Sequence, residues 1–253
     1  MIRLALPRAL TAVRRRFRTM AFARTVPMRN RSAIVSFTFD DFPKSAVSNG
    51  ARLLEDFGAR GTFYATGSYC GRVVDDIPQY CVEDLAALAR AGHEIGCHTF
   101  THVRVSTLSR ASLNREIDLN AAFLAGQLSR IDLRSFAYPF GDLSFAATMQ
   151  LQSRFTACRS SQPGLNIGVA DLGRLQSVRL YDRLIGPRDI FKLIRQAVTN
   201  NAWLIFYTHD VSDRPSNFGC TPGLLKHALE AASEAHLGIL TIDNAVEAIC
   251  ARN

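Results

Sequence analysis

Short apolar runs that end in acidic or imidazole side chains constrain the fold of this chain more than any other feature. Three such runs occur: residues 34–39 before Asp40-Asp41, residues 93–97 before His98 with His102 four residues on, and residues 203–207 before Thr208-His209. α/β enzymes build their sites in this way, with polar side chains at the carboxyl ends of buried strands. The pattern therefore predicts an enzyme site at one edge of a parallel sheet or barrel.

The remaining apolar segments alternate between strand-like and helix-like patterns. We expect strands at 34–39, 61–66, 94–97, 134–138, 155–158, 175–180, 203–207 and 239–242, and helices at 46–57, 81–91, 109–128, 189–199 and 222–235. The helix at 109–128 has one continuous apolar face. Regular alternation predicts an α/β fold, with a parallel sheet covered by helices and closed or nearly closed into a barrel. We expect one catalytic domain over residues 33–253.

The positive charge of the chain is concentrated at its N-terminus. Nine of the 30 basic residues lie in the first 31 positions, which contain no acidic residue, and the remaining 21 basic and 22 acidic residues give a balance of −1. Residues 1–32 are therefore predicted to be a basic extension, and the domain itself gives no indication of nucleic-acid binding. Arginines interrupt every apolar stretch of the length that a secretory signal needs.

Three interpretations of this extension stay open: a transit peptide, an amphipathic helix on anionic lipid, and a disordered extension or a start codon placed too early. We expect a cytoplasmic protein or one peripheral to the membrane. No later segment reaches the ~18 apolar residues of a membrane span. The six cysteines lack metal-binding spacing and are predicted to be reduced, with a bridge between Cys70 and Cys81 as the alternative. No pattern predicts an oligomeric state.

The histidines at 98 and 102 are four residues apart, so on a helical turn both imidazoles would reach one cation. This spacing is a weak signal by itself, because two unrelated histidines match it by chance. Together with the paired aspartates it indicates a catalytic metal site, in which three protein ligands leave one position for water. One carboxylate of Asp40-Asp41 would bind the metal, and the other would take a proton from the water.

Four segments in this order resemble the motifs of the NodB-homology polysaccharide deacetylases of carbohydrate esterase family four. The segments are Thr38-Phe39-Asp40-Asp41, His98-Thr99-Phe100-Thr101-His102, Phe136-Ala137-Tyr138-Pro139-Phe140-Gly141 and Leu204-Ile205-Phe206-Tyr207-Thr208-His209-Asp210. The resemblance covers about residues 33–245 and implies a distorted (β/α) barrel. It also implies Asp41, His98 and His102 as metal ligands and Asp40 as the general base. Zn²⁺ is the expected ion, with Co²⁺, Ni²⁺ and Mn²⁺ as alternatives.

The same resemblance implies roles for residues of the third and last motifs. The backbone N–H of Phe140 would stabilise the oxyanion, and His209 would protonate the leaving amine. Tyr138, Pro139 and Phe206 would contact the substrate.

Two departures from the family pattern concern the groups that orient the base and the acid. The third motif commonly holds an arginine where this chain has Ala137, and Arg134 and Arg179 are the candidates to replace it. The Asp-Trp pair that usually tunes the acid histidine is absent from the sequence, and Asp182 is the candidate in its place.

The expected activity is metal-dependent hydrolysis of acetamido groups on N-acetylated sugars in a polysaccharide or oligosaccharide. One alternative is hydrolysis of another linear or cyclic amide, such as a formyl sugar. A second alternative is a catalytically inactive homologue that binds a glycan. Retention of both Asp40 and His209 argues against the inactive homologue, because a pure binding module needs neither a base nor an acid.

Overall fold

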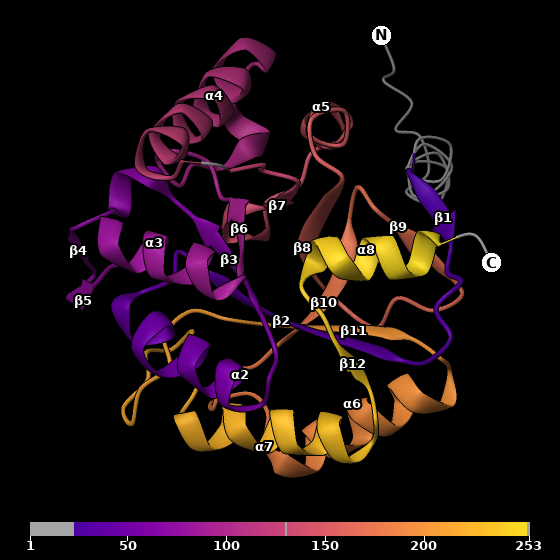
Figure 1. Cartoon of the computed structure of the whole chain (residues 1–253). Helices are drawn as coiled ribbons and strands as arrows, with labels where there is room; N and C mark the ends of the chain where they lie inside the picture. Colours follow the sequence, from indigo (N-terminus) through magenta and orange to yellow (C-terminus); the bar gives the residue numbers. More distant parts are fainter. Residues whose placement is uncertain (1–22, 130, 252–253) are drawn as a thin grey trace, which may run out of the picture.

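Seven parallel strands form a closed barrel in the computed structural model, which describes residues 23–129 and 131–251 (Figure 1). In barrel order they are β2 (Ile34–Asp40), β3 (Thr62–Ala65), β6 (Glu94–Cys97), β7 (Ser135–Ala137), β8 (Ala157–Pro163), β10 (Leu175–Arg179) and β11 (Trp203–Thr208). β11 pairs with β2 from Ile34 to Phe39 and closes the barrel. β12 (Gly238–Ile239) adds to the start of β2. This barrel confirms the fold predicted from the sequence.

Helices surround the barrel, and several begin or end at the residues expected from the sequence. They are α2 (Arg52–Asp56), which continues the π-helical η1 (Ala46–Ala51), α3 (Val82–Ala91), α4 (Arg110–Gln127), α5 (Phe145–Leu151), α6 (Pro187–Thr199), α7 (Pro222–Glu234) and α8 (Ile242–Cys250). Ser109 and Thr221 accept hydrogen bonds from the first-turn amides of α4 and α7. Gly92 ends α3 with a φ of 83°, a conformation that glycine adopts without strain.

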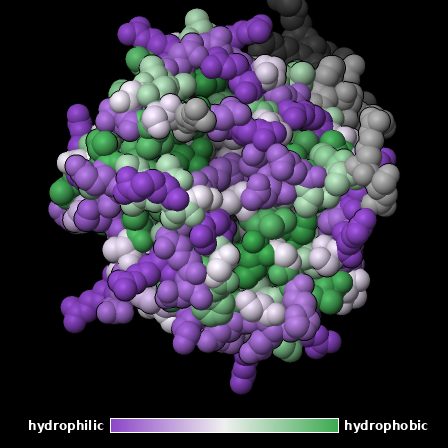
Figure 2. Space-filling model, viewed as in Figure 1, coloured by the Kyte–Doolittle hydropathy of each residue, from purple (hydrophilic) through white to green (hydrophobic). Residues whose placement is uncertain are grey.

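Apolar side chains fill the barrel and the space beneath the helices. Phe39 and Phe63 stack inside the core with ring centroids 4.6 Å apart. Trp203 is fully buried, and its Nε1 donates to Ser36 Oγ at 2.9 Å. Hydrophilic and apolar side chains are mixed on the outer surface around α6 and α7 (Figure 2). The buried strands therefore form a rigid base from which the loops at their carboxyl ends project.

The structure corrects three expected boundaries. β8 starts later than the expected strand at 155–158 and continues to Pro163. The expected strand at 239–242 ends at Ile239, because Thr241 caps α8, whose side chains Ile242, Ala245 and Val246 are buried. β1 (Thr25–Pro27) pairs with β9 (Val169–Asp171), so the folded part begins before residue 33. Residues 1–22 of the predicted basic extension, on which its membrane and targeting interpretations rest, lie outside the described residues.

A small hairpin of β4 (Val73–Val74) and β5 (Ile77–Pro78) follows the 3₁₀ turn η2 (Gly67–Tyr69) near the barrel mouth.

All six cysteines are free thiols. Among residues 23–129 and 131–251, no helix is both long enough and apolar enough to cross a membrane.

Candidate active site

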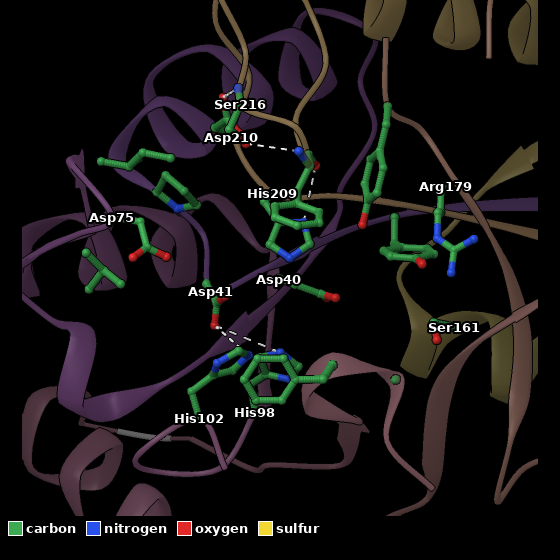
Figure 3. A pocket seen from close by; sticks show the side chains of 18 of the residues that line it. Asp40, Asp41, Asp75, His98, His102, Ser161, Arg179, His209, Asp210 and Ser216 are labelled. Carbon is green, nitrogen blue, oxygen red and sulfur yellow. Dashed lines mark hydrogen bonds and ion pairs between the residues drawn. The ribbon is translucent and has the colours of Figure 1, made fainter. Parts of the chain in front are cut away.

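Asp40 and Asp41 leave the end of β2 in different directions because the backbone turns sharply there. Asp41 and Phe42 have φ angles of 57° and 32°, which are uncommon for residues other than glycine. The Phe42 ring anchors this turn in the core by stacking on Tyr80, with centroids 4.1 Å apart. The two adjacent carboxylates therefore occupy different positions in one cavity (Figure 3).

Asp41 lies beside the two histidines that the sequence predicted as metal ligands. Its Oδ1 is 3.6 Å from His102 Nε2 and 3.9 Å from His98 Nε2, and the potential ligand atoms all lie within 4.8 Å of one another. Ligand atoms about 2 Å from a tetrahedral zinc ion are about 3.3 Å apart. One carboxylate and two imidazoles at this spacing thus fit a divalent cation.

Hydrogen bonds outside the triad orient its histidines. His98 Nδ1 donates to the carbonyl of Ala137 at 2.8 Å, because a carbonyl only accepts, and this leaves Nε2 to face Asp41. The segment from His98 to His102 is a loop and not the helical turn considered from its spacing; His102 itself has a φ of 53°. Glu116 on α4 holds this loop by accepting from the backbone N–H groups of Phe100 and Thr101 at 3.0 and 2.8 Å.

The protonation states of Asp41, His98 and His102 allow these residues to bind a metal ion. Burial lowers the pKa of His98 to about 3 and that of His102 to about 4, so both rings are neutral at neutral pH and have a lone pair to donate. Burial also raises the pKa of Asp41 to about 6, although Thr66 Oγ1 donates to its carboxylate at 3.1 Å. The triad therefore offers two neutral imidazoles and one carboxylate, a set of ligands that zinc accepts.

Asp40 forms a buried ion pair with Arg159, a residue that the sequence analysis did not consider. Arg159 Nη2 donates to both carboxylate oxygens and lies 2.5 Å from Oδ2. Burial alone would raise the pKa of Asp40, but Arg159 and the neighbouring histidines outweigh it and hold the pKa below its usual value. Tyr207 and Tyr64 flank the guanidinium, with ring centroids 4.6 and 5.4 Å from its central carbon. Asp40 is thus ionised and fixed in position.

Of the three residues predicted to orient the base or the acid, two are bound to other groups and one has no partner among the described residues. Arg134 lies on the outside of the barrel and pairs with Asp243 at 2.9 Å and Glu247 at 3.2 Å, both on α8. Asp182 accepts a hydrogen bond from the backbone N–H of Thr221 at 2.8 Å. Arg179 does line the cavity, but the partner of Asp40 is Arg159. Arg134 and Arg179 are therefore wrong as the orienting arginine, and the structure gives Asp182 no contact with His209.

His209 follows β11 and lies across the cavity from the triad (Figure 3). Its backbone N–H and its Nδ1 both donate to the carbonyl of Phe218, at 3.1 and 3.2 Å. Asp210, which is buried, holds the loop that carries Phe218 by accepting from Ser216 N at 2.8 Å and from Ser216 Oγ. A backbone carbonyl thus occupies the orienting position for which the sequence analysis proposed Asp182, and it leaves Nε2 available in the cavity.

The cavity has a volume of about 690 Å³, and three of the five third- and last-motif residues predicted at the site line it, His209 among them. Tyr138 and Phe140 are in its wall, and Phe140 is 56% exposed with its ring centroid 4.4 Å from that of His102. Pro139 opens the 3₁₀ turn η4 (Pro139–Gly141) and is buried outside the cavity lining. Phe206 is fully buried and stacks on Phe37, so its prediction as a substrate contact is wrong; its neighbour Tyr207 lines the cavity instead.

Comparisons with known proteins cover the part of the chain that holds the triad. A family model described as polysaccharide deacetylase matches residues 28–155, which contain Asp40, Asp41, His98 and His102. The relatives that match at the sequence level include a bifunctional xylanase/deacetylase from Pseudobutyrivibrio xylanivorans, 25% identical over 107 residues, and a chitin deacetylase from Pestalotiopsis sp, 29% identical over 113 residues. These matches cover 42% and 45% of this chain but only 16% and 35% of the two relatives.

A solved structure extends the likeness over most of the chain. The Xyl-CE4 domain of a multidomain xylanase, from the hindgut metagenome of Trinervitermes trinervoides, is similar with a TM-score of 0.62 and 15% identity. The alignment covers 86% of this chain and 91% of that domain. At this identity the likeness establishes the barrel fold.

Proposed function

The chain belongs to the polysaccharide deacetylase family, and from this premise we propose that it is a metal-dependent N-deacetylase of N-acetylated sugars in a polysaccharide or oligosaccharide. The proposal rests on the combination of three functional groups around one cavity. These are the metal-competent triad, a carboxylate kept ionised by a buried arginine, and a histidine with a free ring nitrogen opposite them. An amide needs all three, because its carbonyl is a weak electrophile and its nitrogen a poor leaving group.

Asp41, His98 and His102 would hold the metal. When bound, a divalent ion supplies Lewis acidity, which lowers the pKa of water and polarises a carbonyl oxygen. The donor set suits Zn²⁺, and Co²⁺, Ni²⁺ or Mn²⁺ accept the same ligands.

Asp40 would act as the general base. Its ion pair with Arg159 keeps it ionised and fixes its carboxylate in the cavity lining, where it would accept a proton from the attacking water. Arg159 touches Asp40 and is a positioning residue in this account. The base is therefore held ready in its ionised form before the substrate enters.

The carbonyl oxygen and the leaving nitrogen would meet groups on opposite sides of the cavity. Within the turn η4, Gly141 N donates to Tyr138 O at 2.9 Å, and the N–H of Phe140, which precedes it, would donate to the developing oxyanion. Protonated His209 would give the proton on Nε2 to the nitrogen as the C–N bond breaks. The products are acetate and a free amino sugar.

Acetate release from chitin oligosaccharides tests this function. Purified protein is stripped of metal, reloaded with Zn²⁺ or Co²⁺, and compared with the variant His98→Ala and with a matched control, His227→Ala on α7. The proposal expects release that metal restores in the wild type and in His227→Ala but not in His98→Ala. Stoichiometric metal binding without release from this or any other N-acylated sugar would contradict it and favour the inactive glycan-binding homologue.

A further inference from the structure

Two arginines in the cavity wall have no acidic partner. Arg179 ends β10 and Arg183 follows four residues later, and both line the cavity that holds the candidate site. Across residues 23–129 and 131–251, the other cavity arginine, Arg159, is paired with a carboxylate, whereas no carboxylate lies within 4.0 Å of Arg179 or Arg183. The guanidinium of Arg183 lies over the ring of Phe218, 5.5 Å from its centroid. These are charged groups facing a substrate cavity without a neutralising side chain.

Two carboxylates of the cavity, and Asp182 beside Arg183 in the sequence, are committed to other groups. Asp40 is paired with Arg159, Asp182 accepts from Thr221 N, and Asp210 accepts from Ser216. Asp75, on the turn between β4 and β5, lies on the other side of the cavity from Arg179 (Figure 3). The cavity therefore contains two arginines whose charge no carboxylate of the described residues neutralises.

Two exposed aromatic rings also line this cavity. Phe140 is 56% exposed and Phe218 is 52% exposed, and both are cavity residues. Exposed rings of this kind pack against the apolar faces of other rings, so they provide places for sugar units on both sides of the reacting group. Arg183, stacked on Phe218, would then lie beside a sugar bound there.

We propose that the N-acetylated glycan bound by this site carries a carboxylate, on the reacting sugar or on the next one, and that Arg179 and Arg183 bind it. A guanidinium recognises a carboxylate through paired N–H donors, which fix orientation as well as adding affinity. The inference rests on the proposed deacetylase function and narrows its substrate to an anionic glycan. A carboxylate on the reacting sugar and one on its neighbour present the same chemistry and are separated by experiment.

The test compares matched pairs of substrates. Hyaluronan oligosaccharides, in which N-acetylglucosamine alternates with glucuronate, are compared with the same oligosaccharides after reduction of the carboxyl groups to alcohols. Oligosaccharides that alternate N-acetylglucosamine with N-acetylmuramic acid carry the carboxylate on an N-acetylated sugar, and chitin oligosaccharides carry none. With zinc-loaded protein, kcat/KM for acetate release is expected to be about tenfold higher for one of the carboxylated substrates than for its neutral counterpart, mainly through KM.

Variants connect this preference to the two arginines. In Arg179→Gln, Arg183→Gln and the double variant, the ratio of kcat/KM for the carboxylated substrate to that for its neutral counterpart is expected to fall towards one. Arg188→Gln on α6, an exposed arginine outside the cavity, is the matched control and keeps the ratio. Added salt should lower the ratio in the wild type, because it screens exposed charges. Preference for the glucuronate substrate places the carboxylate on the neighbouring sugar. With the muramic acid substrate, mass spectrometry of the product shows which sugar has lost its acetyl group, and therefore whether the carboxylate is on the reacting sugar or on its neighbour.

Failure of this inference is distinguishable from failure of the proposed function. Equal kcat/KM for carboxylated and neutral substrates, or a preference that survives in the double variant, overturns the inference while the deacetylase proposal stands. If no substrate releases acetate, calorimetric binding of the same substrate pairs to the zinc-loaded protein decides the inference. Tighter binding of the carboxylated member, lost in the double variant, supports it, and equal binding contradicts it.

Discussion

Ala137 on β7 and Arg159 on β8 lie directly opposite each other, in register, on neighbouring parallel strands. The resemblance places an arginine at position 137, where this chain has only a methyl group. The carbonyl of Ala137 nevertheless orients His98, and the guanidinium that pairs with Asp40 comes from the adjacent strand. The arginine that pairs with the proposed base therefore comes from the strand next to the one that the resemblance indicated.

Asp40→Asn should lower kcat by about 10²- to 10⁴-fold, because an amide cannot accept the proton of the attacking water. Metal binding should be retained, since Asp41, His98 and His102 are unchanged. Steady-state acetate release and a metal titration measure the two properties separately. Asp56→Asn, an exposed aspartate on α2, is the control and should behave like the wild type. Full activity of Asp40→Asn would remove Asp40 from the mechanism.

Glu116→Ala should weaken metal binding by about 10- to 100-fold, although Glu116 is not a ligand. It removes the acceptor for the backbone N–H groups of Phe100 and Thr101, which hold the loop between the two histidine ligands. Glu116→Gln retains one acceptor oxygen and should fall between Glu116→Ala and the wild type. Competition with a zinc chelator measures the affinity, and Arg115→Ala on the same helix is the control. Unchanged affinity in Glu116→Ala would show that the loop holds its shape without this contact.

Stability should fall as the pH drops below 6.5, in part because of His93. Burial lowers the pKa of this histidine in the folded protein, so the unfolded chain binds its proton first. The neutral ring accepts from Gly61 N at 3.0 Å and donates to Glu55 at 3.1 Å. One such proton changes the free energy of unfolding by at most about 1.4 kcal/mol per pH unit.

Urea unfolding of metal-free protein between pH 7 and pH 5 measures this effect. His93→Asn keeps an acceptor near Gly61 N and removes the titrating ring, so its free energy of unfolding should depend less steeply on pH than that of the wild type. Equal slopes for the two proteins would exclude His93 as a source of the pH dependence.

Much of the fold and the ends of the motif strands could be predicted from the sequence. Apolar runs of four to seven residues between amphipathic helices give a parallel barrel, and the polar residues that follow β2, β6 and β11 converge because parallel strands share one carboxyl edge. This geometry brings Asp41, His98, His102 and His209 to one cavity. Local hydrophobic pattern and strand direction were enough for these residues.

The residues that orient the base and the acid could not be predicted in the same way. Arg159 lies inside a buried strand, where an apolar residue is expected, so the pattern ended the strand at Cys158 and placed the arginine outside it. A buried arginine is stable there only because Asp40, far away in the sequence, neutralises it. The partner of His209 is a backbone carbonyl, which any residue provides and which no sequence pattern marks.

The pH dependence of kcat/KM in the wild type and in Arg159→Met tests the central claim most directly. Arg159 lowers the pKa of Asp40 against the effect of burial, so its removal should raise that pKa and move the acidic limb of the profile to higher pH. Zinc-loaded proteins with equal metal content are compared on the same acetylated oligosaccharide. The account predicts a displaced acidic limb and a lower maximum rate in Arg159→Met; superimposable profiles would contradict the role of the Arg159–Asp40 pair in setting the base.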